Sequence, residues 1–424
     1  MPAGNTLQHG SLRLRLVVPG NVRHNSGGNV YNAALARELA VLGADVETCA
    51  LDGGWPVGSA ADRKRLAALL CDDGGAAVST GAAQTVTIVD GLLACGAPDE
   101  LAAAAAAGRP AWILLHMPLD DTGQGEAGLE HRALRAAAGV ICTSTSAASR
   151  IRARHGLDGI RVALPGTDPA ALSAGSEPPH LVAVAALLPN KDQSLLLAAL
   201  AALTDLPWTA SLVGSDTADP AYAAQLRDTV TQSGLQDRVR IPGELRGGAL
   251  ETEWAAADLS LLISQAETFG LVVTESIARG VPVVVRAGTG AVEALAAGTP
   301  DPTPAVTATQ ALAPTPPAAE PPAAPPAEPP AKHSTATLPG TAVALGTDPA
   351  PLADVLRRWL SDPALRARWR AAAADARHRL PGWDATARTV LEALSAEHRA
   401  VPPSAAGEEK PAAEDSPAAQ AGGQ

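Results

Sequence analysis

Residues 259–285 read LSLLISQAETFGLVVTESIARGVPVVV, and this stretch is the strongest indicator of the fold. Its short runs at 259–263 and 281–285 are aliphatic apart from Ser260 and Pro282, which is typical of strands buried on both faces of a sheet. Between them, residues 272–278 have the composition of a helix. Two parallel strands need a crossover connection of this kind. The stretch therefore predicts a strand–helix–strand unit of a parallel sheet.

The same alternation of strand and helix fills most of the chain, in two groups separated by a Pro-, Gly- and Ser-rich break at 164–179. The first group has expected strands at Leu12–Val18, Asp45–Cys49, Thr85–Asp90, Ala111–His116, Val140–Thr143 and Arg161–Ala163. The second group has expected strands at Leu181–Ala185, Thr209–Val213, Val239–Ile241, Leu259–Ile263 and Val281–Val285. We therefore expect an α/β protein with two Rossmann-like domains, residues 1–170 and 171–396, facing each other across a cleft.

The composition changes at residues 298–338, where proline and alanine dominate. This segment is predicted to be a disordered insertion in the second domain, because such composition cannot build a packed core. An inert tether is the preferred interpretation, and an extended motif for a proline-reading partner is the alternative. A final helix at 383–396 is expected to pack back on the first domain, and the tail, 400–424, to be disordered again.

Charge and cysteine content argue against several classes of protein. The net charge of −12 argues against nucleic-acid binding, which needs a basic surface. The four cysteines lack the spacing of metal ligands, so they are expected to be reduced thiols and no metal site is predicted. No leader and no apolar stretch of membrane-spanning length is recognised. We expect a cytoplasmic protein with at most peripheral membrane contact.

Two carboxylates, Glu267 and Glu275, stand eight residues apart where a buried strand passes into a helix. Phe269 and Gly270 lie between them, so the helix would begin here with its first amide groups exposed. Amides at a helix start bind phosphate, and carboxylates accept hydrogen bonds from sugar and ribose hydroxyls. The alternative is purely structural: Glu275 is favoured near a helix N-terminus, and Glu267 is an ordinary loop residue.

Three weaker signals accompany this pair. Lys191 stands at a helix entry after the first strand of the second domain, where an ammonium group can bind a diphosphate. His116 ends a strand, at the sheet edge where ligands bind in this architecture. Gly27 and Gly28 follow the first strand and let a ligand approach the backbone. Each signal also has an ordinary structural interpretation: a solvated lysine, a structural histidine and a plain turn.

Taken together, these segments resemble the retaining glycosyltransferases of glycosyltransferase family 4, which have the GT-B fold. The resemblance rests on SGGNVYNAALARELAVLGADVE at 26–47, LLHMP at 114–118 and, most specifically, the segment between Glu267 and Glu275 with ARGVPVV behind it. It covers about residues 12–396, apart from the Pro-rich insertion.

The resemblance implies a hexosyltransferase that takes its sugar from a nucleotide-diphosphate donor of the UDP or GDP type, with retention and without a metal or other cofactor. The first domain would bind the unidentified acceptor, a lipid, a glycan or a small molecule, and the second would bind the donor. Glu275 would hold the ribose, Glu267 and His116 would act at the transferred sugar, and Lys191 would bind the diphosphate. Further contacts with the donor would come from Phe269, Gly270, Leu271, Gly27 and Gly28.

The chain departs from this family at the diphosphate position. Relatives carry an arginine a few residues before the lysine, where this chain has Val184-Ala185-Ala186. Arg286 and Arg246 are considered as replacements. The departure keeps two other functions open, a scaffold that binds a nucleotide sugar or a partner without turnover, and a sugar-nucleotide epimerase. Three arginines of one predicted helix are assigned to a solvated face, with contact to an anionic acceptor or a lipid surface as the alternative: Arg150, Arg152 and Arg154.

Overall fold

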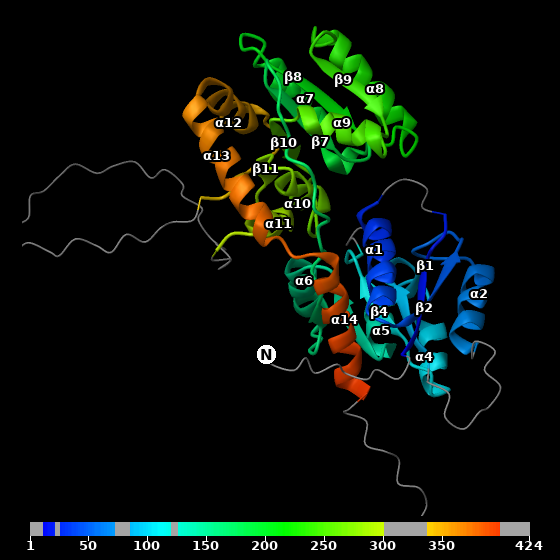
Figure 1. Cartoon of the computed structure of the whole chain (residues 1–424). Coiled ribbons are helices and arrows are strands. Elements are labelled where there is room, and N and C mark those ends of the chain that lie inside the picture. Colours follow the sequence, from blue (N-terminus) through cyan, green and yellow to red (C-terminus); the bar gives the residue numbers. More distant parts are fainter. Residues whose placement is uncertain (1–11, 22–25, 73–84, 120–125, 301–336, 399–424) are drawn as a thin grey trace, which may run out of the picture.

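The structure is a computed structural model that describes residues 12–21, 26–72, 85–119, 126–300 and 337–398. Within these ranges the chain forms two parallel six-stranded sheets (Figure 1). The first has the order β2-β1-β3-β4-β5-β6 and contains β1 (Arg13–Pro19), β2 (Asp45–Leu51), β3 (Thr85–Asp90), β4 (Trp112–Leu115), β5 (Gly139–Cys142) and β6 (Arg161–Val162). The second has the order β12-β11-β10-β7-β8-β9 and contains β7 (His180–Val184), β8 (Thr209–Val213), β9 (Val239–Gly243), β10 (Leu259–Leu262), β11 (Val283–Arg286) and β12 (Gly340–Val343). The predicted α/β architecture with two Rossmann-like sheets is confirmed.

Helices connect the strands and cover the sheets. In the first domain they are α1 (Gly27–Val41), α2 (Ala60–Cys71), α3 (Gly91–Ala94), α4 (Pro98–Ala106), α5 (Glu126–Ala136) and α6 (Thr145–His155). The helices that follow along the chain are η1 (Pro189–Lys191), α7 (Gln193–Ala201), α8 (Pro220–Gln232), α9 (Gly248–Ala256), α10 (Leu271–Ala278), α11 (Ala291–Ala296), α12 (Ala350–Ser361), α13 (Pro363–Ala376), η2 (Arg377–Arg379) and α14 (Trp383–His398). In the part of the chain that the structure describes, no helix has both the length and the apolarity needed to cross a membrane.

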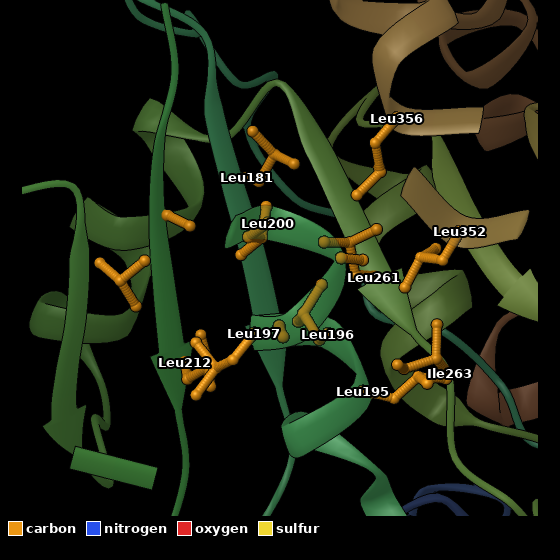
Figure 2. Packing of buried hydrophobic residues seen from close by; sticks show 14 of the residues in the cluster. Leu181, Leu195, Leu196, Leu197, Leu200, Leu212, Leu261, Ile263, Leu352 and Leu356 are labelled. Atoms are coloured by element: carbon orange, nitrogen blue, oxygen red, sulfur yellow. The ribbon is translucent and has the colours of Figure 1, made fainter. Parts of the chain in front are cut away.

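Leucine side chains make most of the core of the second domain, because aromatic residues are only 2% of the chain. Figure 2 shows them converging from neighbouring elements: Leu181 of β7, Leu196 of α7, Leu212 of β8, Leu261 of β10 and Leu356 of α12. The helix α7, with the sequence QSLLLAALA, is apolar on most of its surface and is correspondingly buried. Each fully buried leucine stabilises the fold by about 1.5–3 kcal/mol relative to an exposed one.

The last helix, α14, packs on the first domain. A buried cluster joins Trp383, Val390 and Leu394 of α14 to residues of β1 and α1. The rings of Trp383 and Tyr31 meet edge-on, with their centroids 5.4 Å apart. The Thr386 hydroxyl donates to the carbonyl of Leu164 at 2.7 Å. Figure 1 shows the orange-red α14 lying beside α1. The chain thus passes between the domains twice, near residue 164 and near residue 382.

Two described α-helices and one described strand were not predicted. The helices α3 and α11 are short, four and six residues, so no clear period marks them in the sequence. The strand β12 follows the Pro-rich segment and exists through its pairing with β11, which a local pattern does not report. Most of the predicted insertion, residues 301–336, and the predicted tail, 400–424, lie outside the described residues.

Candidate active site

The loop between β10 and α10 holds the segment that carries Glu267 and Phe269. Phe269 is 4% exposed and packs with Leu262 and Val273, so its side chain anchors the loop. Gly270 precedes α10 with φ of 84°, a left-handed conformation that favours glycine. No side chain caps the N-terminus of α10, and its first turn has no acidic residue. Within this turn the amide of Val273 donates to the carbonyl of Gly270 at 2.9 Å, and the two amides ahead of it, at the helix start, favour an anion.

Lys191 and Glu267, predicted as separate ligands, form an ion pair. The Lys191 Nζ lies 2.6 Å from Glu267 Oε1, with both side chains largely buried. The hydroxyl of Ser264 also donates to this oxygen, at 3.4 Å. The backbone joins the same two loops, because the amide of Gln265 donates to the carbonyl of Asn190 at 2.8 Å. The structure therefore places the lysine and the first glutamate at one point, beside the start of α10.

Glu275 lies one helical turn after Leu271 and is partly buried. Burial raises the pKa of its carboxyl above the ordinary value, the neighbouring Arg279 opposes the rise, and the charges of Asp168 and Glu251 add to it. Arg279 itself donates to the backbone carbonyl of Glu275 at 2.9 Å. Among the described residues no hydrogen bond reaches the carboxylate of Glu275. A desolvated carboxylate without a partner is costly to the fold and available to a hydroxyl ligand.

His116 follows β4 and is held by two residues that sequence reasoning missed, Asn32 and Asp90. Its Nε2 lies 2.9 Å from Asn32 Oδ1 and 3.3 Å from Asp90 Oδ2, while the Asn32 amide donates to Asp90 at 2.7 Å. Burial acts to raise the pKa of Asp90, but the charge of His116 and hydrogen bonds from His116, Asn32 and the Leu92 amide outweigh it, and the pKa is lowered. The signal in the sequence was the position of Asp90 at a strand end, as for His116.

The glycines predicted in the first domain lie against residues of the same candidate site. A Cβ added to Gly28 would stand 3.2 Å from the ring of His116, and one added to Gly27 would stand 3.5 Å from Leu271 of the second domain. Leu271, the first residue of α10, packs at the margin of a core cluster of the first domain. The two domains therefore meet at the start of α1 and the start of α10. This contact brings Gly27, Gly28 and His116 toward the loop between β10 and α10, residues 263–270, which we call the donor loop after its predicted role.

The two arginines considered as replacement cations are engaged elsewhere. Arg286 is buried and donates to the carbonyls of Ile263 and Leu345, and its guanidinium is paired with Asp192. Arg246 is exposed and pairs with Glu244 at 2.9 Å. Arg286 therefore ties β11 to the turn after Lys191, and a phosphate would have to compete with this pairing. The described residues contain no group of three or more side chains suited to hold a metal ion.

Of the three arginines of α6, Arg152 and Arg154 make contacts inside the first domain. Arg152 donates to the carbonyl of Ile160, and Arg154 to the carbonyl of Leu119 and to the fully buried carboxylate of Glu130. The same carboxylate contacts His155 Nε2 at 2.6 Å. Arg154 is thus a structural residue, so the assignment to a solvated face is wrong for it, whereas Arg150 and Arg152 are exposed.

Known proteins resemble this chain in sequence and in structure. Residues 167–308 match the family model of glycosyl transferases group 1. Mannosylfructose-phosphate synthase of Agrobacterium fabrum is 32% identical over 130 residues, a match that covers 29% of this chain and 29% of that protein.

Several solved structures share the fold over most of the chain. HepE of Anabaena in complex with UDP has a TM-score of 0.60 at 19% identity, over 91% of this chain and 100% of its own. Sucrose-phosphate synthase of Thermosynechococcus elongatus has a TM-score of 0.65 at 18% identity, over 92% and 100%. A glycosyltransferase of Rickettsia africae has a TM-score of 0.66 at 15% identity, over 92% and 100%. The fold is GT-B, and the family match supports a glycosyltransferase.

Proposed function

We propose that this chain is a metal-independent, retaining hexosyltransferase of glycosyltransferase family 4. Its second domain binds a nucleotide-diphosphate sugar of the UDP or GDP type, and its first domain binds the acceptor, which is a lipid, a glycan or a small molecule. The UDP complex of HepE, a protein of the same fold, supports the donor class. The four cysteines are free, which fits the reducing environment of the cytoplasm.

The observation that carries this proposal is the arrangement at the start of α10. An uncapped helix N-terminus, the Lys191 ammonium group and the carboxylates of Glu267 and Glu275 lie around one short segment. The helix start and Lys191 are suited to a diphosphate, and the two carboxylates to the hydroxyls on either side of it. Across the domain interface, Gly27 adjoins Leu271, and Gly28 lies directly against the ring of His116.

The chemistry follows from where charge develops. As the bond from the sugar to the diphosphate breaks, the sugar becomes positive and the diphosphate negative. Lys191 leaves Glu267 for the diphosphate, and the amides of α10 add fixed positive charge, so no metal ion is needed. The freed carboxylate of Glu267 then accepts the sugar hydroxyls, while Glu275 holds the ribose. His116, oriented by Asn32 and Asp90, contacts the transferred sugar from the other side.

A scaffold that binds the donor without turnover is the second candidate. It is favoured by the ion pair between Lys191 and Glu267, because the charge of the lysine is already neutralised. It is also favoured by the engagement of Arg286 with Asp192.

Thermal unfolding with a panel of nucleotide diphosphates and their sugars, with Mg²⁺ or with EDTA, tests the proposal. A nucleotide at about 100 times its dissociation constant should add about 2.7 kcal/mol of apparent stability. The shift is expected with one nucleotide family, independent of metal, absent in Glu275→Ala and kept in Asp228→Ala, an exposed carboxylate on α8. If no nucleotide shifts the wild type, the enzyme proposal is wrong. If nucleotides bind but no acceptor in a glycan and lipid panel releases free diphosphate, the scaffold is right.

A further inference from the structure

A carboxylate of the second domain binds the start of a helix of the first domain. Glu293 of α11 accepts the amide of Thr145 at 3.2 and 3.1 Å, through its two oxygens, and the amide of Ser146 at 3.4 Å. Thr145 and Ser146 begin α6. This is a contact between domains, made by residues 148 and 147 positions apart in the sequence.

The chemistry of this contact is that of a helix cap supplied from outside. The first amides of a helix have no partner within the helix, and Ser144, the local cap of α6, binds only the amide of Ala147. Glu293 accepts hydrogen bonds from the two amides that Ser144 does not bind, those of Thr145 and Ser146. A carboxylate at this end also interacts favourably with the partial positive charge of the helix N-terminus. The contact is therefore directional and depends on the charge of Glu293.

On the second domain, Glu293 is coupled to the donor loop. The amide of Glu293 donates to the carbonyl of Gly290 at 3.0 Å, and the amide of Gly290 donates to the carbonyl of Glu267 at 2.8 Å. A Cβ on Gly290 would lie 1.8 Å from the carbonyl oxygen of Thr268, so the two backbones touch directly. Displacement of α11 would therefore displace Glu267.

On the first domain, the start of α6 is coupled to the other half of the site. Thr143 immediately precedes the cap Ser144, and its hydroxyl donates to the carbonyl of His116 at 3.4 Å. Thr143 and Ser144 are almost fully buried, so this end of α6 is part of the sheet edge that carries His116. The single carboxylate of Glu293 thus stands between the segment of His116 and the segment of Glu267.

We propose that Glu293 is a positioning residue: by capping α6 across the domain interface, it sets the placement of His116 relative to Glu267. The role in turnover rests on the proposed function, whereas the capping contact does not. Because donor binding belongs to the second domain, loss of the contact should affect turnover more than donor affinity.

Amide hydrogen exchange on the full chain tests the contact itself. In Glu293→Ala, exchange at the amides of Thr145 and Ser146 should become about tenfold faster or more, because their partner is lost. In the same variant, amide exchange at the start of α8, which Asp219 caps locally, should not change. The control variant Asp228→Asn should leave amide exchange at the starts of both α6 and α8 unchanged. Unchanged exchange at Thr145 and Ser146 in Glu293→Ala would overturn the proposal.

Steady-state kinetics then test the positioning role. A misplacement of about 1 Å costs on the order of 100-fold in rate, so Glu293→Ala should lower kcat by about 10–100-fold with little change in donor KM. Glu293→Gln keeps an acceptor oxygen without the charge, so its kcat should lie between those of the wild type and Glu293→Ala. Faster exchange with unchanged kcat would overturn the positioning role. If wild type and variants neither bind nucleotide nor turn over, the proposed function has failed instead, and the exchange data still decide the contact.

Discussion

Gly290 offers a direct test of whether the donor loop must stay where the structure places it. Its φ of −63° and ψ of −15° suit any residue, so an alanine there carries no backbone strain. The obstacle is space. The new Cβ would lie 1.8 Å from the carbonyl oxygen of Thr268 and 2.9 Å from that of Glu267, where ordinary contact begins at 3.4 Å. The loop would have to retreat by about 1–2 Å, because the obstructing atoms are backbone.

This displacement sets the size of the effect. Overpacking of this kind costs about 1–3 kcal/mol of folding free energy, and a loss of about 2 kcal/mol lowers Tm by about 4–8 °C in a domain of this size. A misplacement of about 1 Å at reacting groups costs on the order of 100-fold in rate. Gly290→Ala should therefore fold with reduced stability and lose about 100-fold in kcat/KM for the donor.

Gly346→Ala is the matched control, since Gly346 is exposed and nothing lies within 4 Å of its added Cβ. Differential scanning calorimetry and donor turnover measured on both variants separate a local effect from a general one. Wild-type Tm and wild-type turnover in Gly290→Ala would refute the reasoning, because the loop would then have moved without consequence. Equal losses in Gly346→Ala would show that the effect is not specific to the loop.

Glu275, Lys191 and Asp90 each allow a further prediction. Glu275→Gln should stabilise the free protein by about 1–3 kcal/mol at about pH 7–8, and should have no such effect below about pH 4. The reason is that burial opposes ionisation of this carboxyl, so the wild type loses stability as pH rises through the raised pKa of Glu275. Urea unfolding at a series of pH values measures the difference. Lys191→Ala should weaken binding of a nucleoside diphosphate about 10–100-fold in calorimetry and leave the free nucleoside unaffected. Asp90→Asn should lower kcat by about tenfold or more, because the orientation of His116 is lost, without changing nucleotide affinity.

Each of these variants has a control or a contrary outcome. A Glu275→Gln variant that is less stable than wild type at about pH 8 would contradict an unpartnered carboxylate. Equal loss of nucleoside and diphosphate binding in Lys191→Ala would indicate a collapsed site rather than a lost phosphate ligand. Reduced nucleotide affinity in Asp90→Asn would place His116 in donor binding, and so contradict a role confined to the transferred sugar.

The elements and the class of fold could be predicted from local patterns in the sequence. Short, mainly aliphatic runs such as 259–263 and 281–285 indicate buried strands, and helical segments of the right length lie between them, so a parallel sheet in each half follows. The same patterns mark the positions at which parallel sheets carry ligands, including Lys191, Glu267 and His116, because these side chains follow directly after strands or enter helices.

The contacts of those side chains, in contrast, depend on the packed tertiary structure. Lys191 and Glu267 are 76 residues apart and pair because η1 and the loop after β10 end side by side at one sheet edge. Asp90 and Asn32 reach His116 for the same reason, and Glu293 reaches α6 across the domain interface. The strand β12, too, exists through its neighbour β11. Local sequence reports the period of an element, whereas ion pairs, caps and sheet edges depend on which distant segments the packed core brings together.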